Sequence, residues 1–174
     1  MNRDFEFSLT FAIPETIALD EIEERLFKAG CDDAIIGFGQ KGRLGLNFTR
    51  EAVSAETAIL SALRDVKQAF PQARLVEAAP DLVGISDMAK LLGFSRQNMR
   101  KLIIAHQASF PLPLHEGASA IWHLADVLLW LSDKRNRSIS PSLLAVARVS
   151  MGVNLARETE RVDRRLQAQL KDIA

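Results

Sequence analysis

The chain has a single cysteine, Cys31, and no tyrosine. One cysteine excludes an intramolecular disulfide and is typical of a reducing compartment, so we expect a cytoplasmic protein. No apolar run reaches the roughly 18 residues that a membrane-spanning helix requires. The first residues alternate polar and apolar side chains and do not resemble a secretory signal. We therefore expect no association with a membrane.

The motifs of common catalytic and metal sites are also missing. The sequence has no His-Glu-x-x-His, no P-loop, no cysteine pair and no nucleophile elbow around a serine. Its three histidines and one distant cysteine make a poor set of zinc ligands. We predict that the protein is not an enzyme and that it uses no metal or cofactor.

An excess of charge of either sign is absent as well, because 22 basic residues balance 22 acidic ones. Zero net charge argues against nucleic-acid binding through bulk electrostatics. The distribution is uneven, however. Residues 1–80 carry nine Lys or Arg against thirteen Asp or Glu, whereas residues 81–137 and 138–174 each have two more cations than anions. This split favours a local, specific contact with DNA that involves the middle of the chain.

The first 80 residues have the pattern of a small domain that contains a sheet and two helices. Alternating or short apolar runs predict strands at residues 5–13, 34–38, 44–48 and 74–78. Apolar residues at helical spacing predict helices at residues 18–29 and 54–70. This order is that of a ferredoxin-like βαββαβ domain, with both helices on one face of an antiparallel sheet. Its role would be regulation, dimerisation or binding of a protein partner.

Two patterns in this domain imitate functional sites. Gly37, Gly39 and Gly42 have the spacing of a dinucleotide-binding fingerprint, but that fingerprint needs a helix after its last glycine. A strand follows here, so we interpret the segment as a hairpin turn. The acidic residues of segment 20–24 are a conceivable metal site. At the start of a helix they are more typical of a solvated face that complements the helix dipole.

The stretch from Ile85 to Ala105 has the pattern of a helix, a tight turn and a second helix. Ala89 is small where the two helices must approach, and Gly93 can take the positive φ that the turn requires. Ser95 is a good N-cap for the second helix. Five apolar residues would pack this pair of helices against its domain. They are Met88, Leu92, Phe94, Met99 and Leu102.

The second helix, Ser95–Ala105, exposes side chains of the types that recognise DNA. Arg pairs with guanine, and Asn or Gln pairs with adenine. Lys and further Arg bind phosphates, as do the free N–H groups at the start of a helix. The predicted DNA-binding residues on this helix are Ser95, Arg96, Gln97, Asn98, Arg100 and Lys101. The alternative is an ordinary helical hairpin with a solvated basic face.

The segment after this helix predicts a β-hairpin. Phe110–Pro113 is expected to be extended because it contains two prolines, and residues 120–123 return as a strand after a turn. His115 at the tip and His123 in the return strand are candidates for phosphate contacts. For both, a plain polar position is the alternative.

Two further predictions concern this part of the chain. Trp122 and Trp130 are expected in the core of the domain. The basic residues 134–137 either bind phosphate or simply end a helix whose dipole favours cations.

These pieces together resemble the winged helix-turn-helix of MerR and excisionase-type (AlpA-like) DNA-binding proteins. The matching segments are Ser86–Gln97, Phe110–Pro113 with Trp122, and Asp126–Leu131, and the stretch that contains them is about a quarter of the chain. The resemblance implies that the hairpin is a wing, which lies along the DNA backbone or in the minor groove beside the recognition helix. His123 departs from the family pattern, in which an Arg commonly follows the Trp.

The C-terminal residues predict a long helix that begins at Pro141 and runs to about Ile173. Its apolar stripe comprises Leu144, Met151, Leu155, Val162, Leu166 and Ile173. The second half has few apolar residues for a buried helix. It therefore indicates a projecting helix that pairs with a second copy, which we favour, or lies across residues 1–80.

The sequence thus predicts an α+β protein in three parts. These are a ferredoxin-like domain at residues 1–80, a winged helix-turn-helix at 81–137 and a helical tail at 138–174. The predicted function is that of a sequence-specific transcriptional regulator, a homodimer that binds double-stranded DNA. Two alternatives are an excisionase-like architectural factor that bends DNA and an antitoxin-like module that binds a protein partner through residues 1–80 or the tail.

Overall fold

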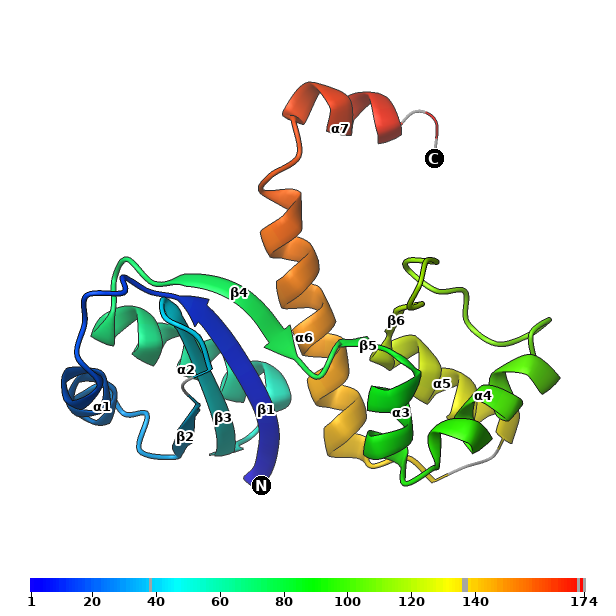
Figure 1. Cartoon of the computed structure of the whole chain (residues 1–174), viewed down its shortest axis with the longest axis horizontal. Helices are drawn as coiled ribbons and strands as arrows, with labels where there is room; N and C mark the ends of the chain where they lie inside the picture. Colours follow the sequence, from blue (N-terminus) through cyan, green and yellow to red (C-terminus); the bar gives the residue numbers. More distant parts are fainter. Residues whose placement is uncertain (38, 136–137, 172, 174) are drawn as a thin grey trace.

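The computed structural model describes residues 1–37, 39–135, 138–171 and 173. Within these residues it has an α+β fold with a four-stranded antiparallel sheet, a two-stranded sheet and seven helices. Figure 1 shows the sheet and its helices on one side of helix α6 (Pro141–Thr159), and a smaller helical part on the other side. Each side has its own cluster of buried apolar residues. None of the described helices combines the length and apolar character needed to cross a membrane.

The N-terminal domain has the predicted order of strands and helices. Its elements are β1 (Arg3–Ala12), α1 (Leu19–Lys28), β2 (Ala34–Gly37), β3 (Arg43–Ala52), α2 (Ala55–Ala69) and β4 (Arg74–Ala79). The strands lie in the order β2-β3-β1-β4, and all neighbours are antiparallel. Strand β3 is longer than predicted, and Phe38, predicted as the end of a strand, lies outside the described residues.

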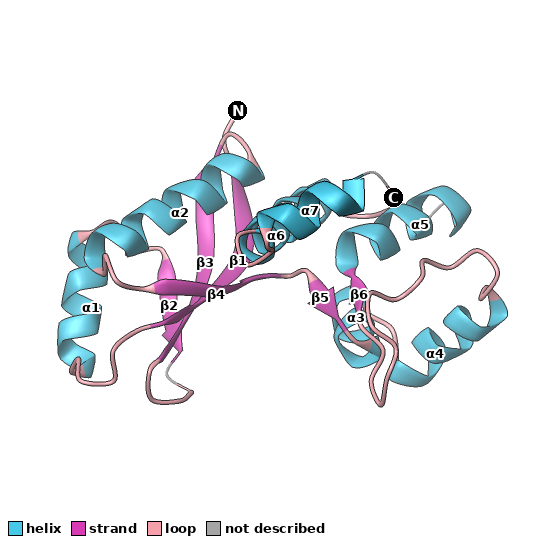
Figure 2. Cartoon of the chain, turned by 90° about the horizontal axis from the view of Figure 1, so that it is seen from above, coloured by secondary structure: helices cyan, strands magenta, loops and turns pink. Residues whose placement is uncertain are grey.

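Alternation along β1 determines which face of the sheet is buried. Phe5, Phe7, Leu9 and Phe11 are at most 3% exposed, whereas the residues between them are exposed or half-buried. The buried side chains pack with those of α1 and α2 in one cluster. Each fully buried side chain of this size stabilises the fold by about 1.5–3 kcal/mol. The two helices therefore cover one face of the sheet, as Figure 2 also shows.

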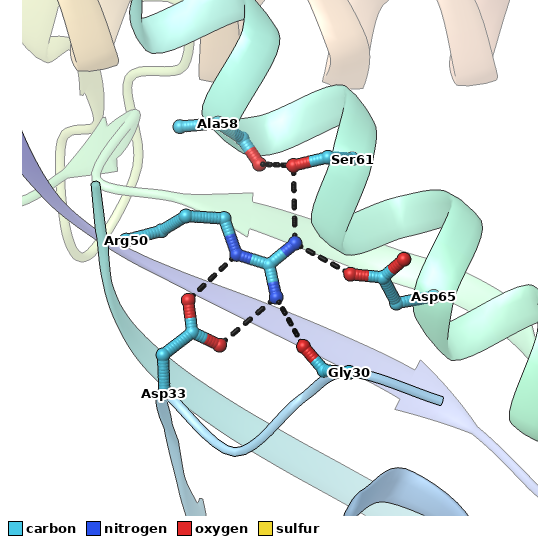
Figure 3. A network of polar contacts seen from close by, with 6 residues as sticks. All are labelled: Gly30, Asp33, Arg50, Ala58, Ser61 and Asp65. Carbon is cyan, nitrogen blue, oxygen red and sulfur yellow. Dashed lines mark hydrogen bonds and ion pairs between the residues drawn. The ribbon is translucent and has the colours of Figure 1, made fainter. Parts of the chain in front are cut away.

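One charged side chain is buried in this domain. Arg50 on β3 is 8% exposed, and its guanidinium donates hydrogen bonds to Asp33 (Nε–Oδ2, 2.7 Å) and to Asp65 (Nη1–Oδ2, 2.6 Å). Further bonds reach Ser61 Oγ and the Gly30 carbonyl, both at 3.0 Å (Figure 3). Hydrogen bonding to Asp33, followed by that to Asp65, raises the pKa of Arg50 despite its burial. This network ties the segment between α1 and β2 to helix α2.

A smaller middle domain follows β4. Its elements are β5 (Leu82–Val83), α3 (Ile85–Leu92), α4 (Arg96–Ala105), β6 (Trp122–His123) and α5 (Leu124–Arg135). Trp122 and Trp130 are 4% and 7% exposed, and both rings contact Phe110 edge-on. The prediction that the two tryptophans belong to the core is confirmed.

The predicted hairpin is only partly formed. Residues Leu114 and His115 bond to Ile121 (Leu114 N to Ile121 O, 2.8 Å; Ile121 N to His115 O, 3.0 Å). The predicted pairing with Phe110–Pro113 is wrong, because β6 pairs with β5, a strand that the sequence did not predict. Proline has no N–H to donate to a β-ladder, so this segment cannot form regular pairing. The Pro111 carbonyl instead accepts a bond from Trp122 Nε1 (3.0 Å).

The predicted single C-terminal helix is two helices. After α6 the chain turns, and α7 (Arg164–Lys171) begins in a new direction (Figure 1). The Asp163 carboxylate causes the new start, because its Oδ1 accepts the N–H groups of Arg165 (2.8 Å) and Leu166 (3.0 Å). Helix α6 itself lies between the two domains. Its neighbouring residues Val146 and Ala147 are 1% and 0% exposed and belong to different core clusters.

A polar network joins the two domains through α6. The Asn154 side chain accepts a bond from Ala78 N and donates to Ala78 O, both at 2.8 Å, at the outer edge of β4. Its Nδ2 also donates to Asp81 Oδ2 (2.8 Å). The other Asp81 oxygen is 2.7 Å from His123 Nδ1 in β6. Three side chains thus connect the edge strand β4 of the first domain, helix α6 and the two-stranded sheet of the second domain.

We predict that Arg50→Met destabilises the fold, because it leaves Asp33 and Asp65 without their shared cation. Removing one partner of a buried ion pair costs roughly 3–5 kcal/mol, and partial exposure of the two aspartates places the expected loss near the lower value. Urea denaturation measures the free energy of unfolding. Arg43→Met, at an exposed position of the same strand, is the control. A loss of less than about 1 kcal/mol would contradict a stabilising role for the network.

The second prediction concerns Glu77 on β4. Burial, and to a lesser extent the Asp81 carboxylate, raise the pKa of Glu77, while Arg157 partly opposes this shift. Such a carboxyl has a higher pKa in the folded than in the unfolded protein. It makes folding less favourable as the pH rises from the unfolded-state pKa to the folded-state pKa. Glu77→Gln should therefore increase the free energy of unfolding at pH 7. The gain should disappear below the usual pKa of 4.5.

Thermal denaturation from pH 3.5 to pH 7 tests this dependence. Glu51→Gln, at an exposed position of β3, controls for the loss of one negative charge. If Glu77→Gln increased the stability equally at pH 3.5 and at pH 7, the charge of Glu77 would not be the cause of the increase.

Candidate nucleic-acid interface

The predicted pair of helices is found as α3 and α4, and its turn has the predicted local chemistry. Gly93 ends α3 with φ 69° and ψ 30°, a left-handed conformation, and its N–H bonds to the Ala89 carbonyl. The Ser95 hydroxyl accepts the N–H of Asn98 (3.1 Å) and so caps α4. At the start of α3, Gly84 N–H donates to the Asp87 carboxylate (2.9 Å). The predicted roles of Gly93 and Ser95 are confirmed.

The inward faces of the two helices agree closely with the sequence pattern. Met88 and Met99 are fully buried, and Ala89 and Leu92 are 3% and 7% exposed. Phe94 and Leu102 are half-buried and pack against the same cluster. These contacts fix the rotation of α4 about its axis, and hence determine which of its side chains point outward.

The six polar residues at the start of α4 and along it that were predicted to bind DNA all point outward. Ser95, Arg96, Gln97, Asn98, Arg100 and Lys101 are all exposed. Within the described part of the chain, none of the three cations on this face forms an ion pair. Their charges are therefore available to a ligand.

Three of these side chains line a common groove. Arg96, Gln97 and Arg100 lie on one side of an open cleft of about 860 Å³. The opposite sides are the start of α3 (residues 84–87) and the far strand of the hairpin (residues 118–121). Arg96 and Arg100 are one helical turn apart and therefore lie on the same face of α4. The fold thus places two guanidinium groups and an amide between a helix start and a hairpin.

The hairpin has fewer positively charged side chains than a surface that contacts nucleic acid usually has. No Lys or Arg occurs between Lys101 and Lys134. His115 is exposed near the tip, as predicted, and its neighbour Glu116 is acidic and exposed. His115 is not among the residues that line the groove. Any contact of the hairpin with phosphate would come from His115, hydroxyls and backbone N–H groups.

His123 does not have the role considered for it. Its side chain is 13% exposed and lies 2.7 Å from the buried carboxylate of Asp81. The hypothesis that His123 contacts phosphate is therefore wrong. No local pattern around His123 indicates this pairing, because Asp81 is 42 residues away along the chain.

Two other patterns that the sequence offered as candidate sites have ordinary structural roles. Gly42 has φ 74° and joins β2 to β3, so the glycine pattern is a hairpin turn as predicted. The acids of α1 include Glu21 and Glu24, which pair with Arg25 and Lys28 one turn later. No metal-binding group of His, Cys, Asp or Glu side chains occurs among the residues described.

The structure describes only part of the basic cluster at residues 134–137. Lys134 is exposed at the end of α5, whereas Asn136 and Arg137 lie outside the described residues. Its relation to the groove stays a prediction.

No protein-family model, curated protein or solved structure matches this chain.

The sequence missed part of the groove. The start of α3 lines it, although that segment was not predicted to take part; residues 118–121 also line it and belong to the predicted wing, in which only the two histidines were named as contacts. The only signals of these groove segments in the sequence were small residues, which permit close approach of a ligand. They are Gly84, directly before a helix, and Gly117, Ala118 and Ser119.

The turn geometry predicts opposite effects for two glycine-to-alanine substitutions. Gly93→Ala places a Cβ on a left-handed residue and should destabilise the fold by about 1 kcal/mol, although nothing crowds the new atom. Gly152→Ala, in the exposed middle of α6 with equally open space, should stabilise it by up to about 1 kcal/mol. Urea denaturation of both variants measures the difference. A stable Gly93→Ala protein would show that the turn can change its conformation.

Proposed function

We propose that the protein is a sequence-specific DNA-binding transcriptional regulator whose reading unit is a winged helix-turn-helix formed by α3, α4 and the hairpin. The observation that supports this most directly is the groove beside α4. There, Arg96, Gln97 and Arg100 are exposed together, and neither arginine forms an ion pair within the described residues, although Asp87 lines the same groove. Arginines that serve the fold have acidic partners, as Arg50 does.

In this proposal α4 enters the major groove, which is wide enough for a helix. Arg96 and Arg100 donate two hydrogen bonds each to guanine O6 and N7, while Gln97 and Asn98 pair with adenine N6 and N7. Lys101 binds phosphate, and the hairpin with His115 lies along the backbone or the minor groove. These contacts use side chains of α4 that stay exposed while Met99 is buried.

The N-terminal domain would supply regulation. Its strand order, with two helices on one face, supports a ferredoxin-like assignment. The other face of the sheet carries exposed or half-buried polar residues such as Glu6, Ser8 and Thr10. This fold serves many purposes, so the regulatory role is proposed from its connection to the middle domain through α6 and not from the fold.

The test is selection of bound duplexes from a random DNA pool at two salt concentrations. Wild-type protein should enrich one motif, and Arg96→Ala/Arg100→Ala should lose it, because each base-reading side chain contributes about 1–3 kcal/mol of discrimination. Arg43→Ala/Arg74→Ala removes the same charge from exposed positions of the sheet and should keep the motif.

Three outcomes would contradict the proposal. Binding that only fades as salt rises, without an enriched motif, would leave non-specific charge as the sole attraction. An unchanged motif in the α4 variant would exclude this helix as the reader. A motif that binds with strong bending of the DNA would favour the excisionase-like architectural factor.

A further inference from the structure

Helix α4 carries one large apolar side chain that points away from the core. Ile104, in the last turn of the helix, is 58% exposed. Leu102 and Ile103 beside it are half-buried and pack against the core cluster of the middle domain, to which Ile104 does not belong. Isoleucine is also a poorer helix former than Ala, Leu or Met. Neither core packing nor helix formation therefore accounts for an isoleucine at this position.

The periodicity of α4 places Ile104 among the side chains proposed to read bases. Successive residues of a helix are about 100° apart, so Ile104 lies between Arg100 and Gln97 when the helix is viewed along its axis. The buried Met99 lies on the other side of the helix. The outward face thus presents an amide, a guanidinium and a branched apolar side chain in adjacent positions.

The length of α4 brings Ile104 within reach of a further base pair. Ile104 follows Arg100 by four residues, which corresponds to roughly 6 Å along the helix axis. Base pairs are stacked about 3.4 Å apart. Recognition helices that lie along the major groove contact bases through residues up to seven apart on one face, and Gln97 and Ile104 have this separation. In such a position, Ile104 lies about two base pairs beyond Arg100.

The chemistry of Ile104 selects one type of base edge. Thymine presents a methyl group in the major groove, whereas the edges of the other three bases present hydrogen-bond donors and acceptors. Isoleucine has no polar side-chain atom, so a donor or acceptor placed against it would lose its water without gaining a partner. The C5-methyl group of thymine would instead exchange water for an apolar contact, which is favourable.

We infer that Ile104 is a specificity-determining residue of α4 and contacts the C5-methyl group of a thymine. The inference rests on the proposed function, in which α4 enters the major groove. It adds a thymine to the guanines and adenines that the polar residues of α4 recognise, about two base pairs beyond the guanine bound by Arg100.

The test uses the duplexes that the wild-type protein enriches from the random DNA pool. Each thymine of the enriched motif is replaced in turn by deoxyuridine, which lacks the C5-methyl group and keeps the hydrogen bonds of the base pair. Fluorescence anisotropy of labelled duplexes measures the dissociation constants. Wild-type affinity should fall about fourfold at one thymine, or at two thymines related by symmetry, because burial of one methyl group contributes a factor of this size.

Two variants separate the role of Ile104 from other causes. Ile104→Ala shortens the apolar side chain and favours the helix, so its affinity should no longer differ between thymine and deoxyuridine at that position. Leu112→Ala is the control, since Leu112 is an apolar residue of the hairpin segment that is 88% exposed. This variant should keep the fourfold difference.

Three outcomes would overturn the inference alone. They are an enriched motif without thymine, a motif in which no deoxyuridine lowers the affinity of the wild type, and a loss of affinity that persists in Ile104→Ala. In each of these cases the enriched motif leaves the proposed function in place. A pool without any enriched motif would contradict the proposed function, and this inference with it.

Discussion

The carboxylate of Asp81 is completely buried where the two domains meet, and both of its oxygens are bonded. One oxygen holds His123 of β6, and the other accepts from Asn154 of α6. A buried carboxylate without partners would cost several kcal/mol, so the partners cannot separate without destabilising the fold. The Asp81 backbone adds a bond, because its carbonyl accepts the N–H of Leu124 at the start of α5 (2.7 Å). This aspartate therefore fixes the base of the middle domain.

Helix α6 takes part in the same network and contacts both domains. Asn154 satisfies both peptide groups of Ala78 at the outer edge of β4, an edge that would otherwise be open to another strand. Eight residues earlier, Val146 joins the core of the N-terminal domain, and Ala147 joins that of the middle domain. The part of the chain that carries the groove beside α4 is thus joined to the N-terminal domain through α6.

Two arginine environments show how the same side chain serves different purposes. Arg50 has exchanged water for five hydrogen bonds within the protein, two of them to Asp33. Arg96 and Arg100 remain in water on the open side of α4. A side chain that recognises a base must exchange water for that base, which requires that the fold makes no competing ion pair. The absence of such pairs in the described structure is what distinguishes the face of α4 from a structural network.

The sequence by itself determined the features that depend on near neighbours. The alternation of β1, the left-handed turn at Gly93, the cap at Ser95 and the outward residues of α4 follow from local conformational preference and periodicity. Tertiary structure alone decided the pairing of β6 with β5, the partner of His123, the place of α6 in two cores and the residues opposite α4 in the groove. The break before α7 belongs to neither group. Asp163 is a local helix cap, but the apolar residues on both sides of it continue at helical spacing and therefore predict one helix. Contacts between residues far apart leave no periodic pattern in the sequence, because they depend on how complete elements pack and which buried polar groups find partners.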